Sequence, residues 1–339
     1  MLINGNMIDK NLWWVGFSHG SWFETTSSDI GYPIFLILLG ISFKYSLESS
    51  IAKGQNDYFL KFFIRSLRLL VLGIILKALP SFSSLNLLGT LQCLAYSSLI
   101  SAGVVKFFGR RSALASAAFI TLFCFSLSIF TVDWNTRWNE GYTFFESVDL
   151  YFCGHTGGVE GIFTTLQAAG FILFGFGTGD FVRDSRLLSK SLLGGAMIGL
   201  GSLLHLFPDH SSVFWIPLVP RLFTLSFCLL AMGATILTLA LFEVLIRLPG
   251  KRLLTQVLEP FGRNSILAYA GVIAFRKIFL QTCLIHCSGE HPSFREWIIF
   301  KLSQYVGASF AVYIFTITFL FLAWLICLQL YRRRIFIRI

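Results

Sequence analysis

The chain has 339 residues, of which 55% are hydrophobic and only 13% are charged, about half the charged fraction of an average soluble domain. The formal net charge is +10, but the lysines and arginines stand in short runs between apolar stretches, as membrane topology requires. This composition excludes an ordinary soluble domain and gives no sign of nucleic-acid binding. We therefore expect an all-α polytopic membrane protein.

Nine stretches are predicted to cross the bilayer, which takes about 20 residues of helix. In chain order they are 30–47, 66–80, 87–105, 112–132, 160–178, 187–206, 216–246, 264–282 and 305–330. The second is short and is expected to begin nearer Tyr58. The seventh is too long for one straight crossing. Pro217 and Pro220 predict a break near its start, because each proline removes a backbone donor.

The loops between these stretches alternate in their content of lysine and arginine. The rich connections are 44–65, 106–111, 183–190 and 247–263, and the poor ones are 80–86, 133–159 and 205–212. The connection 276–301 is an exception, because it mixes basic and acidic residues. By the positive-inside rule the rich loops are cytoplasmic, which places His19 on the outer side and the C-terminus inside. With no internal repeat or linker, we expect one transmembrane domain over 1–339. The long outer loop 133–159 is the natural wall or lid for an external substrate.

The first predicted span follows the polar run "SHGSWFETTSSD", which contains His19 and Asp29. A carboxylate beside a histidine fixes its tautomer and raises its basicity, as general-base chemistry requires. Two simpler interpretations stay open. Asp29 can be an N-cap of the helix that follows, and His19 can be an interfacial side chain near Trp22.

Other polar side chains lie in or at the ends of predicted spans, where they are costly and therefore functional candidates. They are Arg65, Arg68, Gln92, Glu160, Arg221, Asn264 and Ser265. Arg65 and Arg68 can instead reach lipid phosphates, and Gln92 and Asn264 can be hydrogen-bond contacts between helices. Arg263 is interpreted as a topology anchor. Cys283 and Cys287 can share a helix face, but a disulfide or metal site there is not favoured.

Seven segments in chain order resemble the heparan-α-glucosaminide N-acetyltransferase family and its shorter bacterial relatives. In "HGSWFETTSSDIGYPIFLILLG" the family pattern falls on His19, Trp22, Asp29, Pro33 and Gly40. The others are "RSLRLLVLG", "GTLQCLA", "VEGIFTTLQ", "WIPLVPRLFTLSF", "GRNSILAYAG" and "LYRRRIF". The likeness covers nearly the whole chain, although the family's first helix has no counterpart. We therefore expect either a misplaced start or the loss of one span.

The resemblance implies a membrane-embedded acyltransferase of the bacterial inner membrane. Cytosolic acetyl-CoA, or another acyl-CoA, would supply the acyl group to an amino sugar or other carbohydrate on the outer face. His19 would act as catalytic base or acyl carrier, with Asp29 as its partner. The residues expected to bind acyl-CoA are Lys44, Lys61, Arg65, Arg68 and Gln92. The residues expected to bind the acceptor are Asn4, Trp22, Glu160, Arg221, Asn264 and Ser265. No metal is expected, and a homodimer is left open.

The sequence also departs from the family pattern. Cys93 and Leu150 stand where the family has arginine, and Gly158 stands where it has an acid. Two alternatives therefore remain. Broken helices and polar groups within spans also suit a transporter or flippase, and a catalytically inactive relative is the third possibility. Release of free CoA that depends on an acceptor separates a transferase from both.

Overall fold

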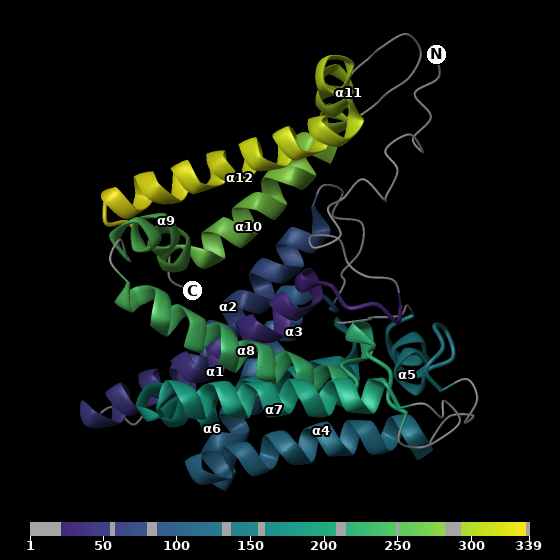
Figure 1. Ribbon diagram of the computed structural model, residues 1–339, viewed down its shortest axis with the longest axis vertical. Coiled ribbons are helices and arrows are strands. Elements are labelled where there is room, and N and C mark those ends of the chain that lie inside the picture. Colours follow the sequence, from purple (N-terminus) through teal and green to yellow (C-terminus); the bar gives the residue numbers. More distant parts are fainter. Residues whose placement is uncertain are drawn as a thin grey trace. The chain divides into compact units, whose positions relative to one another are not determined.

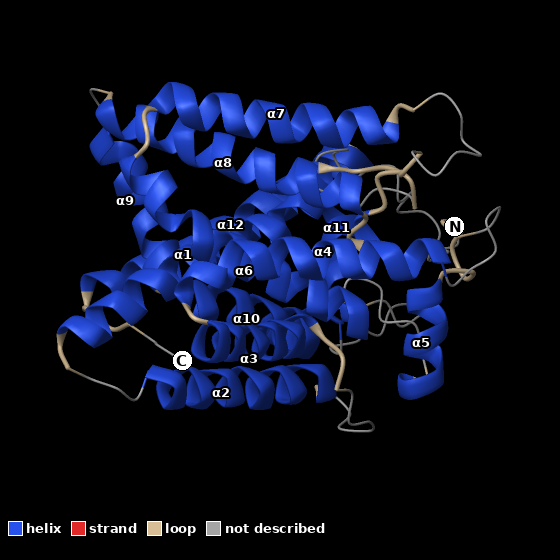
Figure 2. Cartoon of the chain, turned by 90° about the horizontal axis from the view of Figure 1, so that it is seen from below, coloured by secondary structure: helices blue, strands red, loops and turns tan. Residues whose placement is uncertain are grey.

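The computed structural model describes residues 22–54, 58–79, 87–130, 137–154, 160–207, 215–248, 251–281 and 293–336. These residues form helices joined by loops, with no β-strand among them (Figure 1, Figure 2). The chain divides into two compact units. The larger unit comprises His19–Gly73 and Leu87–Ile246, and the smaller comprises Met1–Ser18, Ile74–Asn86 and Arg247–Ile339. That the whole chain forms one domain stays a prediction.

The larger unit contains most of the long helices. They are α1 (Ser27–Ala52), α3 (Thr90–Phe108), α4 (Ala113–Phe130), α5 (Phe144–Cys153), α6 (Ile162–Asp184), α7 (Leu187–His205) and α8 (Leu225–Arg247), with 3-10 turns η2 (Arg110–Ser112) and η4 (Pro220–Leu222). Helix α2 (Tyr58–Ala78) begins in this unit and ends in the smaller one. Helix α6 packs against α1, α3 and α4 and is the central helix of the unit.

Glycines bring α1 and α6 into backbone contact. A Cβ atom on Gly40 would lie 1.9 Å from the carbonyl oxygen of Ile172, and one on Gly175 would lie 2.0 Å from that of Ile37. Neither carbonyl can move away, because each belongs to a helix backbone. Small residues at such crossings are how helices approach closely where lipid supplies no hydrophobic driving force. The α1–α6 contact is therefore specified by two glycines facing two backbones.

Helices α7 and α8 pack in the same manner and add a buried ion pair. A Cβ atom on Gly201 would lie 2.6 Å from the carbonyl oxygen of Ser226. Lys190, which is buried, donates from Nζ to Oε2 of Glu243 at 2.6 Å. Because an ammonium group away from water needs a charged partner, this pair accounts for a lysine on an interhelical face.

Besides the end of α2, the described part of the smaller unit contains four helices and one π-helical turn. They are α9 (Lys251–Arg263), α10 (Ser265–Phe275), η5 (Arg276–Gln281), α11 (Phe294–Val306) and α12 (Ala308–Arg332). The buried residues Ile299, Ala311 and Val312 form a small core between α11 and α12. Lys277 of η5 donates from Nζ to the carbonyl oxygens of Leu76, at 2.9 Å, and of Lys77 and Leu79, each at 3.3 Å. It thereby satisfies carbonyls that the end of α2 leaves without intrahelical partners.

The expected fold class is confirmed. Within the described residues, seven helices are long and apolar enough to cross a membrane, namely α1, α3, α4, α6, α7, α8 and α12. The other two predicted spans, 66–80 and 264–282, correspond to α2 and to α10 with η5, which are not among these seven helices. Helix α2 begins at Tyr58, as expected, and α8 begins only at Leu225, after the break predicted at Pro217 and Pro220. The short helices α5, α9 and α11 were not among the predicted elements.

Candidate functional site

Asp29 helps to cap the first helix. Its Oδ2 accepts hydrogen bonds from the backbone nitrogen and the Oγ1 of Thr26, each at 2.9 Å. Thr26 is the N-cap of α1 and Asp29 is the third residue of the helix, as in a capping box. The interpretation of Asp29 as the N-cap itself was therefore wrong by three positions. Its role beside a catalytic base stays a prediction, because His19, like Asn4, lies outside the described residues.

Two carboxylates lie at the start of α6. Glu160 directly precedes the N-cap Gly161 and accepts a hydrogen bond from Oγ1 of Thr90 at 2.5 Å. Asp149, which is buried, accepts from the backbone nitrogen of Ile162 at 2.8 Å. A Cβ atom on Gly161 would lie 2.0 Å from Oδ2 of Asp149, so only glycine fits there. Both anions are favoured by the positive end of the helix dipole.

Trp22, in the turn before α1, and Arg221, in η4, contact the segment just before α5. The Nε1 of Trp22 donates to the carbonyl oxygen of Trp138 at 2.5 Å. Arg221 donates from Nη1 to Oε1 of Glu140 at 2.8 Å, and its guanidinium carbon lies 5.7 Å from the centre of the Trp22 ring. We call Thr90, Asp149 and Glu160, which lie at the start of α6, the Glu160 cluster.

The segment 137–153 links these residues to α6. The rings of Phe145 and Phe163 stack with centroids 4.8 Å apart, which fixes α5 against the first turns of α6. Glu146 accepts from Oγ1 of Thr143 at 2.8 Å and so has a structural role at the start of α5. Arg137 is only 2% exposed, and burial lowers its pKa. The described part of the long loop is thus ordered by packing, and its action as a lid stays a prediction.

Further polar contacts lie deeper in the larger unit. Gln92 is 1% exposed, and a Cβ atom on Gly73 would lie 2.6 Å from its Oε1. Cys93, at a position where the family has arginine, is buried beside Thr165 and Tyr32. Gln167 donates from Nε2 to the carbonyl oxygen of Phe223 at 3.1 Å. Gln92 therefore lies in the buried interior of the larger unit.

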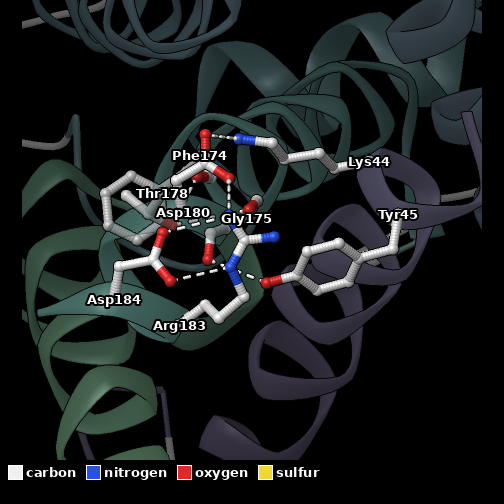
Figure 3. A network of polar contacts seen from close by, with 9 residues as sticks. Lys44, Tyr45, Phe174, Gly175, Thr178, Asp180, Arg183 and Asp184 are labelled. Atoms are coloured by element: carbon white, nitrogen blue, oxygen red, sulfur yellow. Dashed lines mark hydrogen bonds and ion pairs between the residues drawn. The ribbon is translucent and has the colours of Figure 1, made fainter. Parts of the chain in front are cut away.

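The other end of α6 holds a second charged group, the Asp180 cluster, formed by Lys44, Tyr45, Asp180, Arg183 and Asp184 (Figure 3). Lys44, which is buried, pairs with Oδ2 of Asp180. Arg183 binds Oδ1 of Asp180 at 3.3 Å and Oδ1 of Asp184 at 2.8 Å. The hydroxyl of Tyr45 donates to the carbonyl oxygen of Gly179 at 3.0 Å. Two cations and two carboxylates balance within this cluster.

The remaining expected donor-binding residues lie on α2. Its buried face contains Phe62, Ser66 and Leu69. Arg65 lies beside that face and is half-buried, whereas Lys61 and Arg68 are exposed. Lys44 thus has a carboxylate partner, while Lys61 and Arg68 face outward, and the role of all four in binding acyl-CoA stays a prediction.

Asn264 and Ser265 belong to the smaller unit. Asn264 is fully buried, and its carbonyl oxygen accepts from the backbone nitrogen of Ala268 at 2.9 Å as α10 begins. Ser265 is exposed. Both therefore stand at a helix start, and their part in acceptor binding stays a prediction.

Several partners of the predicted site residues were not predicted. Thr90 is the partner of Glu160, Trp138 accepts from Trp22, and Asp180 pairs with Lys44. A signal existed for Asp180, since opposite charges at the ends of two predicted spans are expected to pair. Nothing in the pattern singled out Thr90 or Trp138.

The chain matches no protein-family model and no curated protein sequence. Among the described residues no group of three or more His, Cys, Asp or Glu side chains is arranged to hold a metal ion. The likeness to the acetyltransferase family accordingly rests on the seven segments themselves.

Proposed function

We propose that this protein is a membrane-embedded acyltransferase that moves an acetyl or other acyl group from acyl-CoA to a carbohydrate-type acceptor. One observation supports this most strongly. Four segments that resemble the acetyltransferase family are joined by contacts in the larger unit, although they are far apart in sequence. Thr90 contacts Glu160, and Cys93 lies beside Thr165 and Tyr32. Gln167, in the segment that begins at Val159, contacts Phe223, in the segment that begins at Trp215.

The chemistry divides between a base and an acceptor site. The acceptor's amine or hydroxyl attacks the thioester carbonyl, His19 takes the acceptor's proton, and CoA leaves as a thiolate that is then protonated. If His19 carries the acyl group, its ring nitrogen attacks first and the acceptor displaces it in a second step. Asp29 holds the imidazole tautomer. Glu160 and Arg221 suit sugar hydroxyl and ammonium groups, because a carboxylate accepts and a guanidinium donates.

The donor needs cations for its phosphates. We assign that task to Lys61, Arg65 and Arg68 on α2, which the positive-inside rule places at the cytoplasmic end. Lys44 acts less directly, since its ammonium group is bound by Asp180. Gln92, buried in α3, hydrogen-bonds the donor or the acyl carbonyl on its way to the base.

The test is acceptor-dependent release of free thiol by purified protein in nanodiscs. Acetyl-, propionyl- and butyryl-CoA are offered with a panel of glucosamine-type sugars, to wild type, His19→Ala and His286→Ala. We expect turnover by wild type and by His286→Ala, a histidine outside the resembling segments, and none by His19→Ala. Turnover by His19→Ala at the rate of wild type would contradict the proposal.

A transporter is the second candidate, and the backbone between α7 and α8 favours it. Residues 215–219 are non-helical, η4 follows, and Phe223 has a positive φ of 49° before α8 begins. Irregular backbone of this kind lines the substrate sites of many transporters. Flux of a sugar into proteoliposomes without consumption of acyl-CoA would favour this function over the transferase.

A further inference from the structure

The smaller unit carries a basic surface where α9 and α12 meet. Arg332, Arg333 and Arg334 close α12 and are all exposed. In the part of the chain that the structure describes, none of these three guanidinium groups has a carboxylate partner. Arg263, at the end of α9, has a side chain 53% exposed. We call these four arginines the basic junction.

One carboxylate fixes the geometry of this junction. Glu259 on α9 accepts from Nη2 of Arg263 at 3.0 Å and is hydrogen-bonded with the hydroxyl of Tyr331 on α12. The guanidinium carbon of Arg263 lies 5.8 Å from the centre of the Phe336 ring. Glu259 therefore already has a partner on each of the two helices. The C-terminal end of α12 therefore lies against α9, as Figure 1 also shows. The three arginines at this end are exposed.

Apolar side chains flank the arginines on both helices. Val257 and Leu258 on α9 are each 43% exposed, and Ile326 and Ile335 at the end of α12 are 59% and 46% exposed. Trp324 donates from Nε1 to the carbonyl oxygen of Val257 at 3.0 Å. An indole with a satisfied N–H beside exposed aliphatic side chains is typical of the boundary between acyl chains and headgroups. A short amphipathic helix such as α9 suits the same depth.

We propose that the basic junction binds the headgroup phosphate of an anionic phospholipid, such as phosphatidylglycerol, in the leaflet that faces the cytoplasm. Guanidinium groups bind phosphate through paired hydrogen bonds. Runs of cationic side chains just beyond a membrane helix are attracted to anionic lipid. The adjoining aliphatic side chains favour a lipid over a soluble phosphate, because they supply contacts for acyl chains. This site does not depend on the acyltransferase proposal.

The experiment compares two variants that lose the same charge. Arg332→Gln/Arg333→Gln/Arg334→Gln removes three cations from the junction, and Lys106→Gln/Arg110→Gln/Arg111→Gln removes three from the connection between α3 and α4 in the larger unit. Phosphatidylglycerol and phosphatidylcholine are titrated against each purified protein, and bound lipid is counted by native mass spectrometry. We expect the arginine variant to lose roughly 100-fold in affinity for phosphatidylglycerol and the control variant to stay near wild type.

Equal binding by both variants, or an equal loss in both, would overturn the assignment. A further arm adds CoA to wild type that already holds phosphatidylglycerol. Displacement by micromolar CoA would make the junction a nucleotide-phosphate site instead of a lipid site. If the triple Gln variant does not fold, the triple Arg→Lys variant decides. It should bind phosphatidylglycerol more weakly than wild type, because lysine cannot form the paired hydrogen bonds, and unchanged affinity in folded protein would contradict the proposal.

Discussion

The two ends of α6 carry charged clusters of opposite character. At the start of the helix, the Glu160 cluster places two carboxylates against the positive end of the dipole and holds them by a threonine hydroxyl and a backbone N–H. At the far end, the Asp180 cluster pairs Lys44 and Arg183 with two aspartates. The second cluster balances its own charges and ties α1 to α6, whereas in the first the carboxylates are held by neutral donors, and we propose that this end serves the ligand. The difference suggests that binding belongs to the first end and cohesion to the second.

The largest expected effect on stability is at the contact between α1 and α6, which lies between the two clusters. Gly40→Ala would set a Cβ atom 1.9 Å from the carbonyl oxygen of Ile172, so α1 and α6 must separate. Overpacking against backbone costs about 3 kcal/mol or more of the free energy of unfolding. Gly31→Ala, on the same helix with nothing within 4 Å, should cost nothing. Thermal unfolding of both in detergent checks this, and equal melting temperatures would contradict the described contact.

The second-largest effect on stability is expected from loss of a buried carboxylate, compared with loss of an exposed one. Asp149→Ala removes the acceptor of the Ile162 backbone N–H at a site only 2% exposed. We expect a loss of about 2 kcal/mol in the free energy of unfolding. Asp184→Ala, whose side chain is 60% exposed, should change it by less than about 0.5 kcal/mol. Urea titrations followed by tryptophan fluorescence measure both, and the reverse order would contradict the comparison.

The Lys44–Asp180 pair should respond unequally to loss of its two partners. Asp180→Asn leaves a buried ammonium group without its carboxylate. Because the Asp180 side chain is 55% exposed and water reaches it, we expect a cost of about 1 kcal/mol. Lys44→Met replaces the charge with an apolar chain of similar length and should be close to neutral. A double-mutant cycle measures both variants. If Lys44→Met lowers the free energy of unfolding more than Asp180→Asn does, Lys44 has a role beyond neutralising the charge of Asp180.

The smallest effect on stability is expected at the Arg221–Glu140 pair. Their side chains are 46% and 60% exposed, and such exposed pairs contribute less than about 1 kcal/mol. Glu140→Gln should therefore leave the melting temperature nearly unchanged. If Arg221 binds the acceptor, the same variant should raise the acceptor's KM while leaving that of acyl-CoA alone. Steady-state kinetics with each substrate varied in turn separates the two.

The fold was largely predictable because hydropathy and loop charge act locally. The start of α2 at Tyr58 and the delay of α8 to Leu225 followed from composition and from two prolines. Helices α5 and α9 were missed because neither contains a run long enough to cross a membrane. The contact Thr90–Glu160 joins residues 70 positions apart, and no sequence signal pointed to it. The contact Lys44–Asp180 spans 136 positions, and the opposite charges at the ends of two predicted spans were its only signal. The capping box at Thr26 and Asp29 was not predicted, because four hydroxyl-bearing residues precede Asp29 and any of them can cap a helix.

The measurement that tests the account most directly is thiol release by Asp29→Asn beside Glu48→Gln, an acid near the other end of α1. Asparagine keeps an oxygen that can accept from Thr26, so the cap and the melting temperature should survive, while the carboxylate charge is lost. If Asp29 positions a catalytic histidine, acceptor-dependent turnover should fall roughly 100-fold in Asp29→Asn and remain normal in Glu48→Gln. Full turnover in Asp29→Asn would mean that Asp29 only caps the helix, which would contradict the assignment of this site.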